Sequence, residues 1–425
     1  IYSYIDKVDN QQSENILPQI KQLLTKADIT TKDIDHIVYN QGPGSFTGLR
    51  IGLSVALEVK KKSPQSKILI LEKESNVAFH ASGRNSGVLH AGFYYTADSM
   101  KAKFTVEGNR RMREFCAEHG IKVSETRKIV IAQNAEEVQA IYELERRAVK
   151  NGSEVSVVTE AELARIDPNV KTHKIALYSP NTASVNPGEV CLKLKEVLQA
   201  AGVKFFFNTE YADFKHVPGY VVNCAGLYAD KIAQLFGAGL NYTLLPFKGL
   251  YLKYKGKAPP VGINVYPVPN LKNPFLGVHY TIMADGSIKI GPTAIPALWR
   301  ENYKGFANFS FTEMLETLFY EMRLFVLNSF NFRKLAFEEM KNYCKSIMVK
   351  RAKTMVHELK GDFVPVPAGI RAQLLDKTTN KLVMDFVVEH KPGSTHVLNA
   401  VSPAFTCSFA FAEYIAAQII NNNGK

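Results

Sequence analysis

The stretch GPGSFTGLRIGLSVALEVKKKSPQSKILILE, residues 42–72, decides the fold of this chain. A buried-strand pattern, DHIVYN at 35–40, comes before it, and the stretch itself opens with a glycine-rich turn. The spacing of apolar residues then predicts a helix over 49–62 and a second strand over 67–71, which runs into Glu72. A strand, a glycine turn, a helix and a strand that ends in an acid together form a dinucleotide-binding unit.

The glycine turn departs from the usual GxGxxG spacing of this unit. If Gly52 is the third glycine, Glu72 follows at the expected distance of about 20 residues, but the other two glycine positions hold Thr47 and Leu49. Their side chains would stand where the backbone has to approach the phosphates. The glycines that could form a phosphate loop with one extra residue are Gly42, Gly44 and Gly48. A tight β-to-α turn without a ligand is the alternative at this point.

Strands and helices alternate along most of the chain. Helical patterns are predicted at 99–119, 135–151, 159–166, 188–201 and 405–421, and a mostly helical stretch covers 311–351. Strand patterns cover 203–207, 220–224, 242–295 and 369–400, and a strand at 1–5 and a helix at 13–27 are expected ahead of the quoted stretch. This alternation, with a strand-rich middle part, predicts an α/β fold with an added α+β domain.

Two further segments are predicted to lie against a bound cofactor. The strand YVVNC at 220–224 runs into the small-residue turn Ala225-Gly226. The segment HASGRNSGVLHAGFYY, residues 80–95, closely follows the second strand of the quoted stretch and is rich in small and polar residues. Such residues let the backbone come close to a ligand.

Composition excludes several classes of protein. The 425 residues are 46% hydrophobic and 22% charged, which is a globular composition. No apolar stretch is long enough to predict a membrane span, and no secretory signal pattern is visible. The five cysteines are scattered, and neither an HExxH nor a GxSxG motif occurs, so no metal site and no serine hydrolase is predicted. The scattered cysteines favour a reducing cytoplasm.

The net charge of +12 predicts a basic surface. The lysines and arginines are spread along the chain, and the densest runs, at 60–62 and 345–353, do not interleave aromatic residues, so a nucleic-acid partner is not expected. A solvated basic surface is the simplest interpretation. Peripheral contact with an anionic membrane, at its inner face, is the best of the other options.

From about residue 53 to 420 the chain resembles the L-2-hydroxyglutarate dehydrogenase/oxidase family, which belongs to the FAD-dependent, D-amino-acid-oxidase-like superfamily. The motifs that carry the resemblance are LEKE at 71–74, RNSGVLHAGFYY at 84–95, VNCAGLYAD at 222–230, PFKGLYLK at 246–253, YPVPNLKNPFLGVHYT at 266–281, DGSIKIGP at 285–292, AGIRAQLLD at 368–376 and SPAFTCSFAFAEYIA at 402–416. The resemblance implies a Rossmann-like, glutathione-reductase-like FAD-binding domain with an inserted antiparallel-sheet substrate domain. It also implies oxidation of L-2-hydroxyglutarate or a similar 2-hydroxy acid, with quinone or oxygen as electron acceptor.

The first 52 residues resemble a different family. ENILPQIKQLL followed by GPGSFTGLRIG is similar to the TsaB-type protein of tRNA threonylcarbamoyladenosine synthesis, a scaffold with an actin/Hsp70-like fold. The chain is therefore predicted to be a fusion, in which a foreign strand and turn replace the first strand and two glycines of the flavoprotein. The junction is expected inside the helix, near Gly52.

This interpretation divides the chain into three parts. The expected parts are a TsaB-like β-α-β segment at 1–52, an FAD-binding domain at 53–115, 175–240 and 355–425, and a substrate or cap domain at 116–174 and 241–354. Between 208 and 221 the chain is shorter than the resemblance implies. Two alternatives to an active oxidoreductase stay open: an accessory protein of tRNA modification, and a fusion product with impaired FAD binding and no activity.

Oxidation of a 2-hydroxy acid needs a cation for the carboxylate, a base for the hydroxyl proton, and flavin N5 as hydride acceptor. Arg371 in GIRAQ is predicted to bind the carboxylate or the flavin, because a guanidinium pairs bidentately with carboxylates. His90 and His279 are the predicted bases, with a structural role for each as the alternative. Lys248 and Tyr251 are predicted to line the substrate pocket.

The residues expected around FAD come from the glycine turn, the end of the second strand and the motifs of the resemblance. They are Gly42, Gly44, Gly48, Gly52, Glu72, Lys73, Ser82, Arg84, Asn85, Ser86, Ala225 and Gly226.

Overall fold

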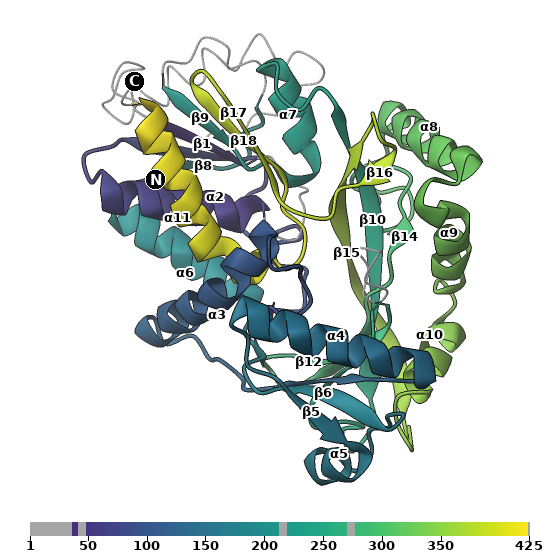
Figure 1. Ribbon diagram of the computed structural model, residues 1–425. Coiled ribbons are helices and arrows are strands. Elements are labelled where there is room, and N and C mark those ends of the chain that lie inside the picture. The colour runs from purple at the N-terminus through teal and green to yellow at the C-terminus, as the bar shows by residue number, and fades with distance from the viewer. Residues whose placement is uncertain (1–35, 41–47, 212–218, 270–276, 424–425) are drawn as a thin grey trace.

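The computed structural model describes residues 36–40, 48–211, 219–269 and 277–423. Two large sheets with their helices, and one pair of short strands, make up these parts of the chain (Figure 1). The strand expected at 1–5, the helix expected at 13–27 and the turn glycines Gly42 and Gly44 lie outside the described residues.

The first sheet has six strands and is parallel at its centre. β1 (His36–Asn40) pairs in parallel with β2 (Ile68–Glu72) on one side and with β9 (Tyr220–Asn223) on the other. Further out, β8 (Lys204–Phe206) pairs with β2, β18 (Ser394–Asn399) pairs with β9, and β17 (Val387–Lys391) forms an antiparallel edge. The strand that precedes the glycine turn therefore occupies a central position in the sheet.

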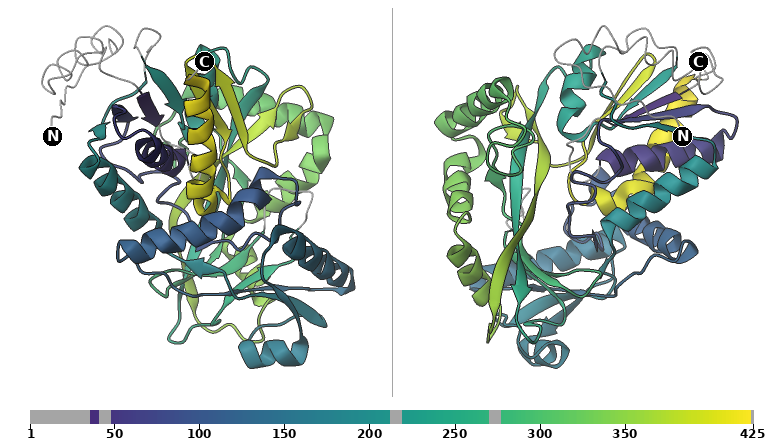
Figure 2. Two further views of the ribbon diagram at one scale, coloured as in Figure 1. Left: turned by 60° about the vertical axis from the view of Figure 1, so that its left-hand side comes forward. Right: turned by 180° about the vertical axis from the view of Figure 1, so that it is seen from behind.

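Four helices cover this sheet. They are α2 (Gly48–Lys62), α3 (Met100–Glu118), α6 (Pro187–Ala200) and α11 (Ala404–Asn423), and α11 packs against both α2 and α3 (Figure 2). One apolar core joins the helices to the strands, with Ile51, Val55 and Phe411 fully buried. Each such side chain contributes roughly 1.5–3 kcal/mol by leaving water. Because α2 follows β1 directly, its amino end lies at the carboxyl edge of the sheet.

The second sheet has ten strands. In sheet order they are β16 (Lys381–Leu382), β15 (Asp362–Asp376), β10 (Tyr242–Lys255), β13 (Ile288–Gly291), β12 (His279–Ile282), β11 (Asn264–Pro267), β4 (Lys128–Ile131), β6 (Ile175–Ser179) and β5 (Ser156–Thr159), with β14 (Ile295–Pro296) paired to β10. The long strands β10 and β15 form an antiparallel ladder over most of their length. Two short strands, β3 (Val88–Leu89) and β7 (Ala183–Ser184), pair separately.

Three strands of the second sheet lie outside the range expected for the cap. β6 falls in 175–240, and β15 and β16 fall in 355–425, yet β6 pairs with β4 and β5, β15 pairs with β10, and β16 pairs with β15. Strand pairing joins residues far apart in sequence, so local patterns do not reveal it. The division of the chain into domains stays a proposal, with these three strands assigned to the cap.

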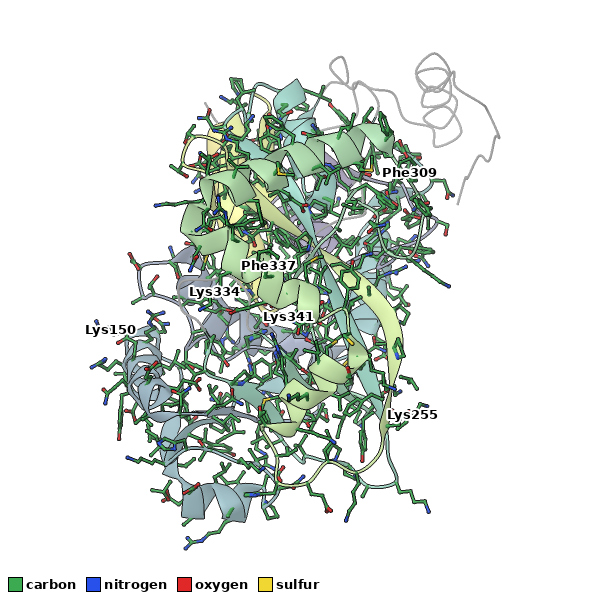
Figure 3. The ribbon with its side chains drawn as sticks, turned by 90° about the vertical axis from the view of Figure 1, so that its right-hand side faces the viewer. Lys150, Lys255, Phe309, Lys334, Phe337 and Lys341 are labelled. Atoms are coloured by element: carbon green, nitrogen blue, oxygen red, sulfur yellow. The ribbon has the colours of Figure 1, made fainter. Side chains whose placement is uncertain are left out.

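The second sheet carries its own helices. α4 (Ala135–Asn151) and α5 (Glu160–Ile166) pack on β5 and β6, and α7 (Ala229–Leu235) contacts both β18 and β10. The helices α8 (Phe311–Leu327), α9 (Phe332–Lys341) and α10 (Lys345–Lys353) lie on the far side of β10 and β15 from the first sheet (Figures 2 and 3). None of the helices in the described ranges is both long and apolar enough to cross a membrane.

The predicted helices that fall within the described residues are confirmed, with ends within two residues of those expected. Side-chain caps explain this agreement. Ser99 Oγ accepts a hydrogen bond from Ala102 N at the start of α3, and Asn134 Oδ1 accepts one from Glu137 N at the start of α4. Thr159 and Glu162 form a reciprocal capping box at the start of α5. These devices satisfy backbone N–H groups locally, so the sequence alone determines where such helices begin.

Candidate active site

The carboxyl edge of the six-stranded sheet brings together several of the predicted cofactor residues, and we call it the cofactor edge. Asn40 at the end of β1 lies opposite Glu72 at the end of β2, and Tyr39 lies opposite Asn223 on β9. The turn after β9 is held by a hydrogen bond from Ala225 N to Asn223 Oδ1 of 3.1 Å. In parallel sheets of this kind, ligands bind outside the carboxyl ends of the strands.

Glu72 and its neighbours define the chemistry of the cofactor edge. Glu72 is only 2% exposed, and its Oε1 accepts a hydrogen bond of 3.0 Å from Glu74 N. Gly226 has a positive φ of 60°, a conformation that glycine adopts without strain. Lys73, the next residue after Glu72, forms ion pairs with Glu301 at 2.7 Å and with Glu74 at 3.1 Å. Its ammonium group is therefore already paired with carboxylates of the protein.

The loop that contains Ser82, Arg84, Asn85 and Ser86 is held mainly by backbone contacts. Asn85 Nδ2 donates to the carbonyl oxygens of Ala81 and Ser82, and Asn85 Oδ1 accepts from Gly87 N. Arg84 Nε donates to a backbone carbonyl of the same loop at 2.7 Å. Ser86 is half-buried. Asn85 therefore shapes the loop, rather than reaching toward a ligand.

The same loop lies directly against β15. A Cβ atom added to Gly369 would come within 2.8 Å of the Arg84 carbonyl oxygen, so only glycine fits there without a shift of the backbone. The Arg84 guanidinium stacks over the Tyr303 ring at 4.5 Å. This close approach joins the part of the chain that carries the cofactor edge to the ten-stranded sheet.

The residues at the cofactor edge fit FAD. An acid at the end of β2 can accept hydrogen bonds from ribose hydroxyls, and a helix amino end can bind a pyrophosphate. Glu72 and the start of α2 supply these two features, and Ala225-Gly226 places small residues beside them. Gly48 and Gly52 both belong to α2, at its first and fifth residues.

A second group of predicted residues converges on a basic cluster, which we define as His90, Lys128, His279 and Arg371. The first three side chains are buried, and that of Arg371 is half-buried. The strand register places Lys128, Tyr266 and His279 on one face of the ten-stranded sheet. His279 stacks on the Tyr266 ring with centroids 3.7 Å apart, and Lys128 Nζ lies 4.1 Å from the centroid of the same ring.

Lys128 is the member of the basic cluster that sequence reasoning missed. Its side chain is fully buried, and its Nζ has no hydrogen-bond partner among the described residues. Burial lowers the pKa of Lys128 to about 7. Besides Tyr266, the rings of Tyr94 and Phe93 lie 5.3 and 5.9 Å from Nζ. The sequence did not indicate a functional role for this lysine, because a single lysine at the end of a strand, here before IVIA, is usually solvated.

The geometry of His279 suits a proton acceptor. Its Nδ1 lies 2.8 Å from the Gly277 carbonyl oxygen, which can only accept, so Nδ1 carries the proton and Nε2 keeps a lone pair. Burial, followed by the nearby charges of Lys128 and Arg371, lowers the pKa of His279 to about 3. The imidazole is therefore neutral over the physiological range.

His90 lies beside the same charges. Its side chain is buried, and its Nδ1 has no hydrogen-bond partner in the described parts of the chain. Burial and the charge of Lys128 hold the pKa of His90 well below its ordinary value. The backbone fixes the residue from both sides, since His90 N donates to Thr406 Oγ1 and Asn109 Nδ2 donates to His90 O.

Arg371 and Tyr251 lie together, whereas Lys248 does not join them. One guanidinium nitrogen of Arg371 donates to the Thr293 carbonyl oxygen at 2.8 Å, and burial lowers the pKa of Arg371. Burial raises the pKa of Tyr251 to about 12, and the charge of Arg371 opposes that shift.

The register of β10 and β15 explains why Lys248 is separated from Arg371. Phe247 pairs with Arg371 and Lys248 with Ile370, so Lys248 and Arg371 point to opposite faces of the sheet. Lys248 Nζ donates to Asn302 Oδ1 at 2.8 Å instead. A substrate role for both residues in one subsite is therefore not supported by the geometry.

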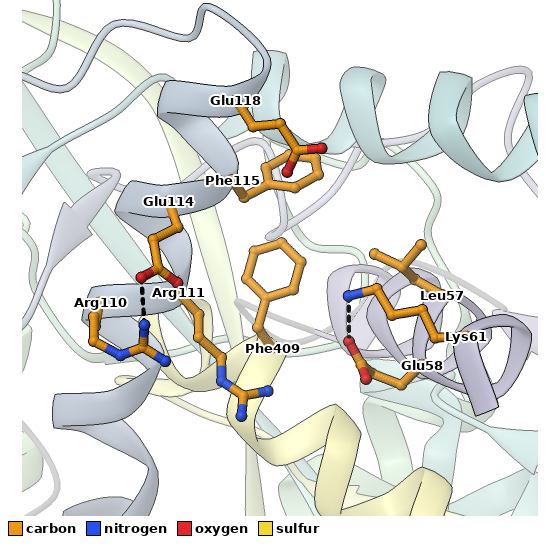
Figure 4. Close-up of a pocket in the computed structure, with 9 residues that line it drawn as sticks. All are labelled: Leu57, Glu58, Lys61, Arg110, Arg111, Glu114, Phe115, Glu118 and Phe409. Carbon is orange, nitrogen blue, oxygen red and sulfur yellow. Dashed lines mark hydrogen bonds and ion pairs between the residues drawn. The ribbon is translucent and has the colours of Figure 1, made fainter.

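A pocket elsewhere on the molecule has a different character. It lies between α2, α3 and α11, and its walls include the ion pairs Lys61–Glu58 and Arg110–Glu114 (Figure 4). None of the predicted site residues lines it. Within the described ranges, no group of three or more His, Cys, Asp or Glu side chains is arranged to hold a metal ion.

Comparison with known families gives two matches. A family model described as FAD dependent oxidoreductase matches residues 51–418. A model described as tRNA N6-adenosine threonylcarbamoyltransferase matches residues 6–64, so the two matches overlap within α2. The tRNA-modification match covers only the amino-terminal segment, the part in which the sequence predicted a fusion.

Curated relatives match over most of the chain. The mitochondrial L-2-hydroxyglutarate dehydrogenase of Caenorhabditis elegans is 36% identical over 400 residues, which cover 87% of this chain and 91% of that protein. The L-2-hydroxyglutarate dehydrogenase of Escherichia coli K12 is 33% identical over 388 residues, 87% of this chain and 90% of that protein. The human mitochondrial enzyme of the same name is 34% identical over 403 residues, 87% of this chain and 86% of that protein.

Solved structures share the fold. An L-alpha-glycerophosphate oxidase from Mycoplasma pneumoniae with FAD bound superposes with a TM-score of 0.68 at 19% identity, over 91% of this chain and 94% of that one. A glycine oxidase from Geobacillus kaustophilus gives a TM-score of 0.65 at 16% identity, over 91% and 94%. This chain therefore belongs to the FAD-dependent oxidoreductases and, within them, to the L-2-hydroxyglutarate dehydrogenase family.

Proposed function

We propose that this chain oxidises L-2-hydroxyglutarate, or a 2-hydroxy acid close to it, to the 2-oxo acid. The observation that carries the proposal is the basic cluster, in which Lys128 Nζ is buried without a hydrogen-bond partner among the described residues, beside two neutral imidazoles and the half-buried Arg371. A buried ammonium group is stabilised when a group of opposite charge joins it. A carboxylate of a small dicarboxylate is such a group, and the family assignment points to the same class of substrate.

The residues of the basic cluster divide the work of binding and proton transfer. Arg371 and Lys128 each hold one carboxylate of the substrate, Arg371 by a bidentate pair and Lys128 as a point charge. His279 Nε2 accepts the hydroxyl proton, and His90 is the second candidate for that role. The C2 hydrogen leaves as hydride, for which bound FAD supplies the acceptor at N5.

Substrate binding itself raises the basicity of His279. Burial lowers the pKa of His279, and the charges of Lys128 and Arg371 lower it further. A carboxylate on each cation neutralises the charge that opposes protonation, so the pKa of His279 rises toward the working range of a base. The base becomes effective when the substrate is in place.

The electrons leave the protein through an acceptor, which we propose to be a quinone or oxygen. The hydride that bound FAD would take up and the proton that His279 accepts together amount to two electrons and two protons, which would reduce a quinone to a quinol or oxygen to hydrogen peroxide. We place the protein in the cytoplasm, with contact to the inner face of a membrane where a quinone is the acceptor.

The absorption spectrum of the purified chain tests the proposal. Flavin bands that bleach on addition of L-2-hydroxyglutarate are expected. A protein that takes up no FAD would instead support the alternative of a fusion product with impaired cofactor binding.

Deletion of residues 1–33 tests the alternative of a tRNA-modification accessory protein. If tRNA modification in the source cell does not change after the deletion, that alternative is removed.

A pair of variants tests the role of the two cations. Lys128→Met and Arg371→Lys are compared on L-2-hydroxyglutarate and on a 2-hydroxy acid of the same length that lacks the distal carboxylate. We expect KM for the dicarboxylate to rise about tenfold or more, since a hydrogen bond to a charged group contributes roughly 1.5–3 kcal/mol. If a variant raises KM for the dicarboxylate but leaves KM for the monocarboxylate unchanged, the cation that it lacks binds the distal carboxylate. Unchanged KM values in both variants would contradict the proposed binding mode.

A further inference from the structure

Arg50 is a buried cation in the first turn of α2. It is the third residue of that helix, and its side chain is the largest one that is fully buried in the described part of the chain. One guanidinium nitrogen, Nη2, donates to the Ser82 carbonyl oxygen at 2.8 Å. The other two, Nε and Nη1, have no hydrogen-bond partner among the described residues. A guanidinium group in such a place is costly unless acceptors join it.

The surroundings of Arg50 do not neutralise its charge. Its Cζ lies 3.2 Å from the centroid of the Phe405 ring. Burial lowers the pKa of Arg50, and the groups that oppose this shift are the thiols of Cys191 and Cys116, without a carboxylate of the described residues among them. Burial also raises the pKa of Cys116 to about 11, so that thiol is neutral at neutral pH. A ring face and thiols offset only part of the cost of burying a cation.

The amino ends of three helices lie on the same side of the sheet as this guanidinium group. α2 and α11 each follow a parallel strand of the six-stranded sheet, and α6 leads into another one, so all three helices begin at the carboxyl edge. Phe405 belongs to the first turn of α11, and Cys191 is the fifth residue of α6. A helix amino end carries partial positive charge, which stabilises anions and opposes a cation. The place occupied by Arg50 therefore favours a bound anion.

Arg50 belongs to the segment in which the chain departs from the flavoprotein pattern. The oxidoreductase match begins at residue 51 and the tRNA-modification match ends at residue 64, so Arg50 lies inside the second match and outside the first. It directly follows Leu49, which occupies a glycine position of the GxGxxG pattern. The buried cation and the altered glycine turn are therefore neighbours in the chain.

We propose that the Arg50 guanidinium binds the pyrophosphate of FAD, together with the amino end of α2. Its Nε and Nη1 donate to phosphate oxygens, while Nη2 stays on the Ser82 carbonyl oxygen. The side chain then supplies by charge what the turn lacks in glycines. The inference rests on the proposed function, because it takes FAD as the cofactor. FAD affinity is measured without turnover, so an error in the role of Arg50 would leave the proposed oxidation standing.

Titration of the cofactor-free full chain with three probes tests the inference. The probes are FAD, ADP, which keeps the pyrophosphate, and adenosine, which lacks it. In Arg50→Met, Kd for FAD and for ADP should rise about tenfold to hundredfold, the effect of losing hydrogen bonds to a charged group, and Kd for adenosine should stay the same. Glu72→Gln should instead weaken all three, because each contains the ribose. The matched control is Arg146→Met, an exposed arginine on α4, which should bind each probe as the unmodified protein does.

Thermal unfolding separates cofactor binding from a structural role of Arg50. Without FAD, Arg50→Met should unfold at the same or a higher temperature, because the change removes a buried charge that lacks an anionic partner. The rise in Tm on addition of FAD should be smaller than in the unmodified protein, since the variant binds FAD more weakly. Arg50→Lys keeps the charge but not the planar fork, so its Kd for FAD should lie between the other two.

Four results would overturn the proposal. Equal Kd values for FAD in Arg50→Met and the unmodified protein would mean that the guanidinium does not contact the pyrophosphate. An equal loss of adenosine binding would indicate a distorted start of α2. A lower Tm without FAD, together with an unchanged rise on its addition, would assign Arg50 a structural role. Inorganic pyrophosphate that binds at Arg50 without displacing FAD would assign the site to a free anion.

Discussion

At the cofactor edge, the sheet register, the end of β1, the start of α2 and the turn at Ala225 bring backbone groups and one carboxylate, Glu72, together. In the basic cluster, by contrast, everything depends on side chains, namely buried His90, Lys128 and His279 and half-buried Arg371. A site built from backbone tolerates a change of sequence as long as the strand, turn and helix remain. A site built from buried charges does not.

This difference bears on the prediction that the chain is a fusion, in which a segment of another origin supplies β1. The family match to a tRNA-modifying enzyme ends at residue 64, and the oxidoreductase match begins at residue 51. β1 still pairs with β2 and β9 in parallel. Strand pairing needs only extended backbone and apolar side chains, which DHIVYN supplies.

The largest effect is expected at the base of the basic cluster. His279→Gln removes the lone pair at Nε2, and kcat should fall about 100- to 10,000-fold, the range for loss of a general base. Steady-state kinetics with L-2-hydroxyglutarate measure the change. His357→Gln, an exposed histidine, is the control and should leave kcat unchanged. A variant with full activity would assign the base to His90.

The next largest effect concerns the cofactor edge. Glu72→Gln should weaken FAD binding roughly ten- to hundredfold, since a hydrogen bond to a charged group contributes about 1.5–3 kcal/mol. Titration of the cofactor-free protein by flavin fluorescence gives Kd. Glu136→Gln on the exposed face of α4 is the control. If both variants bind FAD equally, Glu72 does not bind the ribose, and the cofactor edge depends on its backbone alone.

The contact between the two regions should respond to a single methyl group. Gly369→Ala places a Cβ within 2.8 Å of the Arg84 carbonyl oxygen, so loop and strand have to move apart. We expect a loss of about 1–3 kcal/mol in the free energy of unfolding, the range for overpacked sites. Thermal unfolding measures it. In Gly188→Ala the added Cβ meets only Asn186 Oδ1 at 3.4 Å, so this control should unfold at the original temperature.

The last effect is a pH dependence of stability, which is read as a difference between two pH values. The pKa of Lys128 is about 7 in the folded protein and about 10.4 when unfolded, so burial of its charged form destabilises the protein fully below pH 7. This penalty fades as the pH rises toward the unfolded pKa. Lys128→Met should therefore raise Tm more at pH 6 than at pH 9. An equal rise at both values would mean that Lys128 has an ordinary pKa.

The sequence by itself determined the secondary structure and the class of fold. Apolar spacing and helix caps act between residues close in the chain, so α3, α4 and α5 lie where their patterns predict. The acid after the second strand and the motifs of the family resemblance were also visible without a structure. The same local information could not show that β6, β15 and β16 pair within the ten-stranded sheet.

Only the tertiary structure decided which charges meet. Lys128 and His279 are far apart in the sequence, and the pairing of β4 with β11 and of β11 with β12 puts them on one face. The register of β10 and β15 separates Lys248 from Arg371, which a sequence motif cannot express. Likewise, Glu313 and Glu316 hold one face of α8 against the protein, and this orientation leaves apolar side chains such as that of Met322 exposed. Each of these outcomes depends on non-local pairing, whose energy appears only once distant segments are packed together.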